Sequence, residues 1–199
     1  MVILVIVMLL LGIVCGQYVF DSTLVSILNN LSDYILYVLM FSVGLSVGTN
    51  KTIFSKMKSY GGYVFVIPIG IIVGSMIGGV VCSWLLHTPL DHSLSIVCGL
   101  GWYSLSGVLL SAMYGAEIGT IAFLSNLLRE IISFIIIPFV VEHFNVYTAI
   151  APAAATSEDT TLPMLVKYTS EEVVLLGLFN GVICSLAVPI LIKIIDILL

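Results

Sequence analysis

The stretch TIAFLSNLLREIISFIIIPFVV, residues 120–141, is apolar enough to span a membrane, yet it carries two adjacent charges, Arg129 and Glu130, near its middle. A bilayer core about 30 Å thick needs roughly 20 apolar residues per helix, and ionisable groups at its centre are costly. Neighbouring helical residues point in different directions, so each charge needs its own partner. Asn126 and Ser133 share a helix face with Glu130, which predicts a polar stripe along an apolar helix.

The whole chain has the composition of a membrane protein. Its 199 residues are 60% hydrophobic and 9% charged, with a mean hydropathy of +1.25, whereas soluble domains are about 25% charged. We therefore expect an all-α integral membrane protein, multi-pass and in contact with lipid. The net charge of −5 argues against nucleic-acid binding. Isolated cysteines and the absence of a catalytic triad or phosphate-binding loop predict no disulfide framework, metal site, cofactor or enzymatic activity.

A window of membrane-spanning length divides the chain into about seven transmembrane segments with short connections, and this predicts one transporter domain over residues 1–199. Clustered Lys51, Lys56 and Lys58 mark the loop after the second segment as cytoplasmic. The seven predicted segments are residues 1–16, 24–48, 61–86, 93–113, 116–141, 146–166 and 172–195.

Two stretches are unlike ordinary lipid-facing helix. CGLGWYSLSG, residues 98–107, combines glycines and hydroxyl side chains, and APAAATSEDTTLP, residues 151–163, places two carboxylates between two prolines. Stretches of this kind must face protein, water or a solute. Residues 151–163 predict a discontinuous helix whose ends can bind ions. An ordinary loop between two shorter helices is the alternative.

Glu130 has two interpretations at this stage. It can be a carboxylate in a solute pathway, binding a cationic group, exchanging a proton, or both. Alternatively, Arg129 and Glu130 can form buried ion pairs that only set the helix register.

Three stretches follow one another in a specific order: GWYSLSGVLLSAMYGAEIGTIAFLSNLLREIISFIIIP (residues 101–138), ATSEDTTLP (155–163) and NGVICSLAVPIL (180–191). These stretches and their order resemble the bacterial lysine exporter family of the LysO type. The resemblance is good over roughly the last 140 residues and loose over the first 60. It implies export of L-lysine, and of analogues such as thialysine, across the cytoplasmic (inner) membrane of a prokaryote. It also implies that Glu130 is the intramembrane acid.

The resemblance also suggests missing helices, because single-chain members carry roughly 100 more N-terminal residues. We expect either a small companion membrane subunit of about 95 residues or a homo-oligomer. Residues 61–199 then resemble one five-helix half of an inverted-repeat transporter, and residues 1–60 resemble part of an incomplete second half.

The expected mechanism is antiport, in which lysine leaves as protons, or alternatively Na⁺, enter. Glu130 is expected to couple protons and, with ten further residues, to bind substrate. Those ten are Asp159, Thr156, Ser157, Thr160, Thr161, Ser104, Ser106, Trp102, Tyr103 and Asn126. Supporting roles are expected for Arg129, Glu158, Gly101, Gly107 and Pro163. The alternatives are an ion-coupled carrier of another organic solute and a structural subunit that transports nothing.

Overall fold

The computed structural model describes residues 64–199 without a gap, together with residues 7, 11–12, 14–21, 24, 27–28, 31, 34, 38, 41 and 45. The chain forms two compact units, Met1–Leu45 and Ser46–Leu199. In the first unit the described residues are helical except at 19–21. The predicted segments 1–16 and 24–48 lie mainly outside the described residues, as does the loop containing Lys51, Lys56 and Lys58.

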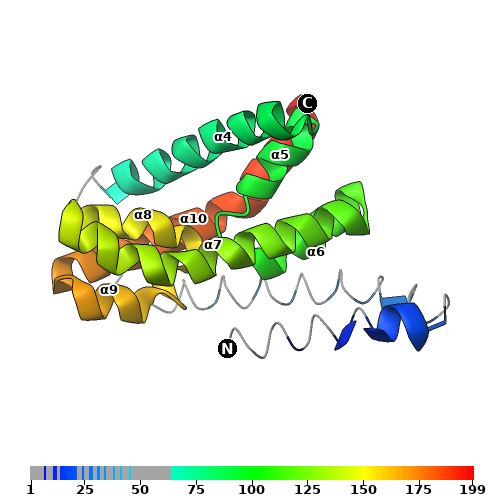
Figure 1. The fold of residues 1–199 in the computed structure, drawn as a ribbon, viewed down its shortest axis with the longest axis horizontal. Coiled ribbons are helices and arrows are strands. Elements are labelled where there is room, and N and C mark those ends of the chain that lie inside the picture. The colour runs from blue at the N-terminus through cyan, green and yellow to red at the C-terminus, as the bar shows by residue number, and fades with distance from the viewer. Residues whose placement is uncertain are drawn as a thin grey trace. The chain divides into compact units, whose positions relative to one another are not determined.

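The described part of the second unit consists of long helices and of shorter helical elements (Figure 1). Three long helices, α4 (Val66–Leu86), α7 (Ala116–His143) and α10 (Glu171–Leu198), are long and apolar enough to cross a membrane. The shorter elements are α5 (Leu90–Val97), α6 (Tyr103–Tyr114), η2 (Val146–Ala149), α8 (Ile150–Ala153), η3 (Ala154–Glu158) and α9 (Leu162–Tyr168).

The expectation of an all-helical membrane protein is therefore confirmed for the described residues, whereas the count of seven transmembrane segments remains a prediction. Segments 61–86, 116–141 and 172–195 correspond to the three long helices within a few residues at each end. Segments 93–113 and 146–166 do not form single helices. At about 1.5 Å per residue, none of the shorter helices alone reaches across a 30 Å core.

Residues 90–114 form a hairpin, which we call the first hairpin, made of α5, a turn at residues 98–102, and α6. Leu100 and Gly101 have φ angles of 49° and 95°, and two consecutive residues with positive φ end one helix and redirect the chain. The rings of His92, near the start of α5, and Tyr114, at the end of α6, lie 4.8 Å apart. The predicted segment 93–113 is therefore divided by a turn, which lies within the stretch 98–107 that the sequence marked as irregular.

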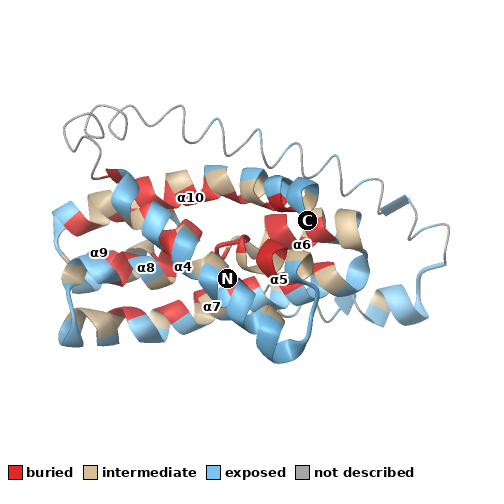
Figure 2. Cartoon of the chain, turned by 90° about the horizontal axis from the view of Figure 1, so that it is seen from above, coloured by how far each residue is buried: buried red, intermediate tan, exposed pale blue. Residues whose placement is uncertain are grey.

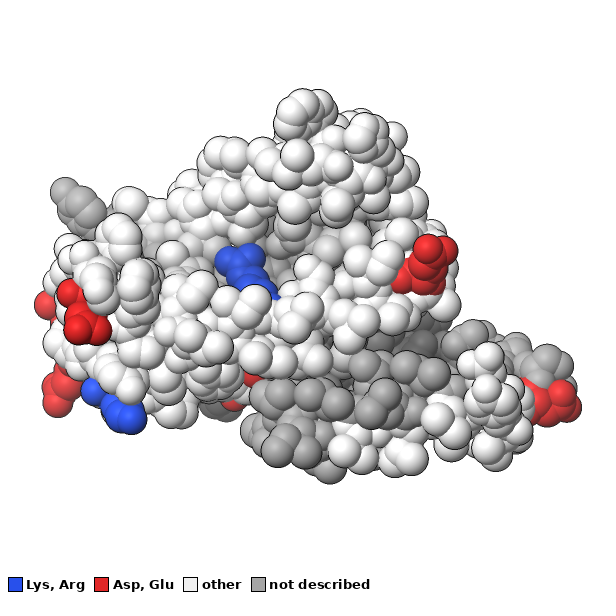
Figure 3. Space-filling view, in the orientation of Figure 1, with Lys and Arg blue, Asp and Glu red and all other residues white. Residues whose placement is uncertain are grey.

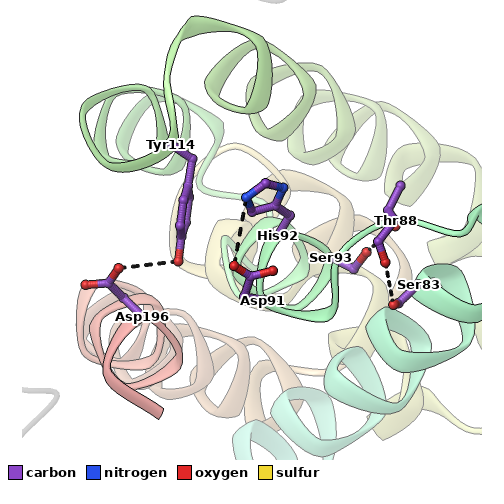
Figure 4. Close-up of polar contacts among 7 residues, drawn as sticks. All are labelled: Ser83, Thr88, Asp91, His92, Ser93, Tyr114 and Asp196. Atoms are coloured by element: carbon purple, nitrogen blue, oxygen red, sulfur yellow. Dashed lines mark hydrogen bonds and ion pairs between the residues drawn. The ribbon is translucent and has the colours of Figure 1, made fainter. Parts of the chain in front are cut away.

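Both ends of the first hairpin lie beside the C-terminal end of α10. The Tyr114 hydroxyl donates to Asp196 Oδ1 at 3.4 Å, and His92 Nε2 is 3.9 Å from Asp91 Oδ2 (Figure 4). Asp196 also accepts from Lys193 at 2.7 Å. This polar group marks one end of the unit.

Residues 146–168 form the second hairpin, made of η2, α8, η3, a turn at residues 159–161, and α9, and it enters from the opposite end of the unit (Figure 1). Ala154 has a φ of 49° and separates α8 from η3. The apolar cluster at the base of this hairpin joins Ile137 of α7, Ile150 of α8, Leu165 of α9 and Val173 of α10. The chain therefore returns to its starting end before α10 begins.

The buried residues gather where the two hairpins approach each other between α7 and α10 (Figure 2). Small residues of α10 allow the second hairpin to lie close to it. A Cβ added to Gly181 would be 2.5 Å from Glu158 Cβ and 2.6 Å from the Glu158 backbone nitrogen, and neither atom is the end of a flexible side chain. The second hairpin therefore rests directly on the α10 backbone.

We predict that Gly181→Ala lowers the free energy of unfolding by about 1–3 kcal/mol, because the added methyl group displaces the backbone of the second hairpin. Thermal unfolding of the purified protein in detergent measures the effect. Gly78→Ala is the matched control, since no described heavy atom lies within 4 Å of a Cβ at Gly78 on α4. A Gly181→Ala variant as stable as the Gly78→Ala variant would contradict the close packing.

Candidate functional site

The tips of the two hairpins are joined by a backbone hydrogen bond. The Ala155 N–H donates to the Leu100 carbonyl at 3.1 Å. Gly101 is in contact with the second tip, since its Cβ position lies 3.5 Å from Thr156 Cγ2 and 3.8 Å from the Ala153 carbonyl oxygen, and its φ of 95° favours glycine. Two stretches separated by more than 50 residues thus meet between the long helices.

Asn126 of α7 holds the first tip through its side-chain amide. Its Oδ1 accepts from the Gly101 N–H at 2.8 Å, and its Nδ2 donates to the Ile96 carbonyl at 3.0 Å and to Ser106 Oγ at 3.3 Å. The side chain is buried. Asn126 was predicted as a substrate ligand, and that role stays a prediction. The hydrogen bonds seen here show that its amide positions the first tip.

Asn180 of α10 holds the second tip in a similar way. Its Nδ2 donates to the Ala154 carbonyl at 2.8 Å and to Ser157 Oγ at 3.0 Å. Ser157 Oγ in turn donates to the Gly177 carbonyl at 2.7 Å. Sequence reasoning missed Asn180 as a site residue, although a lone amide in the middle of the apolar stretch 172–195 was the available signal.

Most of the predicted hydroxyl ligands also bond to the protein's own backbone. Thr156 Oγ1 donates to the Ala153 carbonyl at 2.8 Å, and Thr161 Oγ1 donates to the Thr156 carbonyl at 2.9 Å. Ser106 Oγ donates to the Trp102 carbonyl at 2.9 Å. These three hydroxyl groups are buried and stabilise the tips.

Glu130 is different, because its carboxylate is buried without a complete set of partners. The side chain is 2% exposed, and its Oε2 has no hydrogen-bond partner among the described residues. Asn126, Glu130 and Ser133 are all buried on α7, which confirms the predicted polar stripe. A buried carboxylate oxygen without a donor is costly, so a protein retains one when a proton or ligand uses it.

Groups from both hairpins surround the Glu130 carboxyl. Thr160 and Asp159 of the second hairpin interact with it electrostatically, and Tyr103 of the first hairpin is within electrostatic range of both Glu130 and Asp159. The Thr160 hydroxyl, like Glu130 Oε2, lacks a partner of good geometry among the described residues. Asp159 is exposed and Tyr103 is half-buried. We call Glu130, Thr160, Asp159 and Tyr103 the acidic cluster.

Arg129 and Glu158 adjoin members of the acidic cluster in the sequence, but their side chains bond to other residues. Arg129 Nη1 donates to Ser75 Oγ of α4 at 3.1 Å. Glu158 Oε1 accepts from Ser185 Oγ of α10 at 2.8 Å. Neither residue forms an ion pair with any described residue. Ser75 and Ser185 were not predicted, and single serines in apolar helices give little sign of their partners.

The remaining predicted residues lie around the tips. Trp102 and Ser104 are half-buried at the start of α6, and Pro163 is exposed in the first turn of α9. Gly107 packs against α7, with a Cβ position 3.0 Å from Phe123 Cβ. In the part of the chain that the structure describes, no three His, Cys, Asp or Glu side chains are grouped to hold a metal ion.

Comparison with known proteins places this chain in one family. Residues 6–195 match the family described as lysine exporter LysO. The chain is 36% identical to "Lysine exporter LysO" of Escherichia coli (strain K12), over 81% of the chain and 53% of that protein. It is 34% identical to a Haemophilus influenzae Rd protein named "Putative lysine exporter", over 82% of the chain and 83% of that protein. The chain thus spans about half the length of the Escherichia coli relative, and no solved structure matches it.

We predict that Asn126→Ala loosens the first tip, because it leaves the buried Gly101 N–H and Ile96 carbonyl without their partner. The expected loss is about 1–3 kcal/mol of stability, together with faster hydrogen exchange at residues 98–102, measured by mass spectrometry. Thr120→Ala is the control on the same helix, since the exposed Thr120 hydroxyl bonds only to the Ala116 carbonyl. Exchange at the tip that is equal in the two variants would refute this role.

Proposed function

The chain belongs to the lysine exporter family, and we propose that it exports L-lysine and analogues such as thialysine from the cytoplasm by exchange for protons. The observation that carries this proposal is the buried Glu130 carboxylate, which lies beside the tips of both hairpins and has one oxygen with no hydrogen-bond partner in the described part of the chain. Relatives that are named lysine exporters support the choice of substrate. The proposed location is the inner membrane of a prokaryote, with the chain crossing it several times.

Glu130 suits a cationic substrate for a physical reason. Glu130 is near the midpoint of α7, so neither interface is within reach of its side chain. A carboxylate at that depth is stabilised by a cation or by a proton, and each can replace the other. We propose that the lysine ε-ammonium and a proton bind Glu130 in turn, so that release of one to the outside accompanies entry of the other.

The arrangement of the two hairpins is the second observation that supports the proposal. Irregular backbone at membrane depth is tolerated where it is buried in protein or lines a solute pathway. The first tip also presents the N-terminus of α6, with half-buried Trp102, Tyr103 and Ser104 beside it. We propose that these groups, with Thr160 and Asp159, form the walls along which the substrate moves.

We further propose that the two hairpins belong to an inverted repeat of a discontinuous-helix transporter. Leu100 and Ala154 both have φ angles of 49°. Each is followed 26 residues later by a tip-holding asparagine, Asn126 or Asn180. The hairpins enter from opposite ends, as a repeat with an axis in the membrane plane requires. This division lies within residues 90–198, whereas the sequence suggested residues 61–199 as a single half.

Two other predictions remain open to experiment. A companion subunit of about 95 residues, or a homo-oligomer, is tested by the mass of the purified detergent-solubilised complex. Sodium in place of protons, and an organic solute other than lysine, are tested by changing the ion gradient and the solute in the same transport assay. A purely structural subunit would give no flux under any of these conditions.

We predict that Glu130→Gln abolishes lysine export, by at least about a hundredfold, because the amide neither attracts an ammonium nor exchanges a proton at neutral pH. Everted membrane vesicles with an imposed proton gradient measure lysine accumulation. The variant should insert and express normally, since glutamine has nearly the same shape.

The matched control is Glu117→Gln, because Glu117 lies exposed in the first turn of the same helix. It should transport at the rate of the unaltered chain. Normal export from the Glu130→Gln variant would contradict the assignment of Glu130, and lysine transport without proton movement would contradict the coupling.

A further inference from the structure

Arg129 is a half-buried cation whose position in an apolar helix calls for an anion. It lies near the midpoint of α7, while its hydrogen-bond partner Ser75 is near the midpoint of α4. The Arg129 Cδ lies 3.9 Å from the Cβ position of Gly101, so the side chain passes over the first hairpin tip. On the face seen in Figure 3, most of the described surface is uncharged, with a basic patch near its middle and acidic groups mainly toward its edges.

Among the described residues, Arg129 makes one hydrogen bond, to a serine, which leaves most of the guanidinium donors without a partner there. A guanidinium has five N–H donors and binds carboxylates through two parallel hydrogen bonds. An unpaired cation at the centre of a membrane protein is costly, and such groups normally have an anionic partner. Among the described residues no carboxylate lies within ion-pair distance of Arg129.

Glu158 belongs to the second hairpin and lies against α10. Its backbone packs on Gly181 of α10, and its Oε1 accepts from Ser185, one turn further along α10. The Cys184 thiol is within electrostatic range of both Arg129 and Glu158. The Cβ position of Gly101 that lies near Arg129 is also 3.5 Å from Thr156 Cγ2, two residues before Glu158. Arg129 and Glu158 are therefore both close to the joined tips, and they form no ion pair with each other.

We propose that Arg129 and Glu158 form a subsite for the head group of an α-amino acid, Arg129 binding the α-carboxylate and Glu158 the α-ammonium. This inference rests on the proposed function, since Glu130 is then left for the ε-ammonium. Because Arg129 and Glu130 are adjacent on α7, their side chains leave the helix in different directions. The head and the tail of one lysine molecule would thus bind on two sides of the joined tips.

The charges of the three residues match those of the substrate. Lysine at neutral pH carries one carboxylate and two ammonium groups, and the subsites offer one guanidinium and two carboxylates. Asp159 is the fourth charged group near the tips, but it is exposed and therefore solvated. A site of this kind binds the head group through both of its charges, so it should bind an α-amino acid more tightly than a simple amine or a simple carboxylic acid.

Ligands that each lack one group of lysine test the assignment. The full chain is purified in nanodiscs, and binding of lysine, cadaverine (no α-carboxylate), 6-aminohexanoate (no α-ammonium) and norleucine (no ε-ammonium) is measured by calorimetry. Arg129→Gln should weaken lysine binding by about tenfold to a hundredfold, the range of a charge-assisted hydrogen bond, while cadaverine binding stays unchanged. Glu158→Gln should weaken lysine binding and leave 6-aminohexanoate unchanged.

The same measurements contain the results that would overturn the inference. If Arg129 only attaches α7 to α4, Arg129→Gln weakens lysine and cadaverine binding equally, or changes neither. Should the glutamine variant fail to fold, Arg129→Lys retains the charge but loses the two-pronged geometry, and a selective loss of lysine over cadaverine is still expected. Absence of lysine binding by the unaltered chain would overturn the proposed function, and the inference with it.

Discussion

A lipid bilayer offers no hydrogen-bond partners to peptide groups, and this constraint governs the described unit. Both hairpins end their helices in the interior of this unit, so the freed N–H and carbonyl groups at the tips must be satisfied by protein. The bond from the Ala155 N–H to the Leu100 carbonyl joins the tips directly. Asn126 and Asn180 satisfy further tip groups from the two long helices. Most polar side chains of this region are therefore committed to the backbone.

A few polar groups are not committed in this way, and the proposed function rests on them. Within residues 64–199 and the other described positions, Glu130 Oε2 and the Thr160 hydroxyl have no hydrogen-bond partner, and Arg129 makes one hydrogen bond, to a serine. All three groups flank the joined tips, and all three would be stabilised by a ligand that brings both positive and negative charge. An amino acid with a cationic side chain is such a ligand, which agrees with family membership reached independently by comparison.

The sequence allowed prediction of much of the local structure around the site. The spacing of Asn126, Glu130 and Ser133 correctly placed these residues on one buried face, because helical periodicity decides that question. Composition also located both irregular stretches. It could not predict the chain reversals, because hydropathy does not distinguish a crossing helix from two short helices that return. Leu100 and Ala154 adopt positive φ although neither is a glycine, and tertiary contacts rather than residue type determine that conformation.

The most direct test of the central claim, that Glu130 and the two hairpin tips form the lysine site, is protection of Glu130 from a hydrophobic carbodiimide. This reagent modifies protonated carboxyl groups in membrane proteins, and mass spectrometry follows the modified peptide over time. Saturating lysine should slow the modification of Glu130 at least about tenfold, whereas norleucine, which lacks the ε-ammonium, should have no effect. Modification of Glu130 at the same rate with and without lysine would contradict the account.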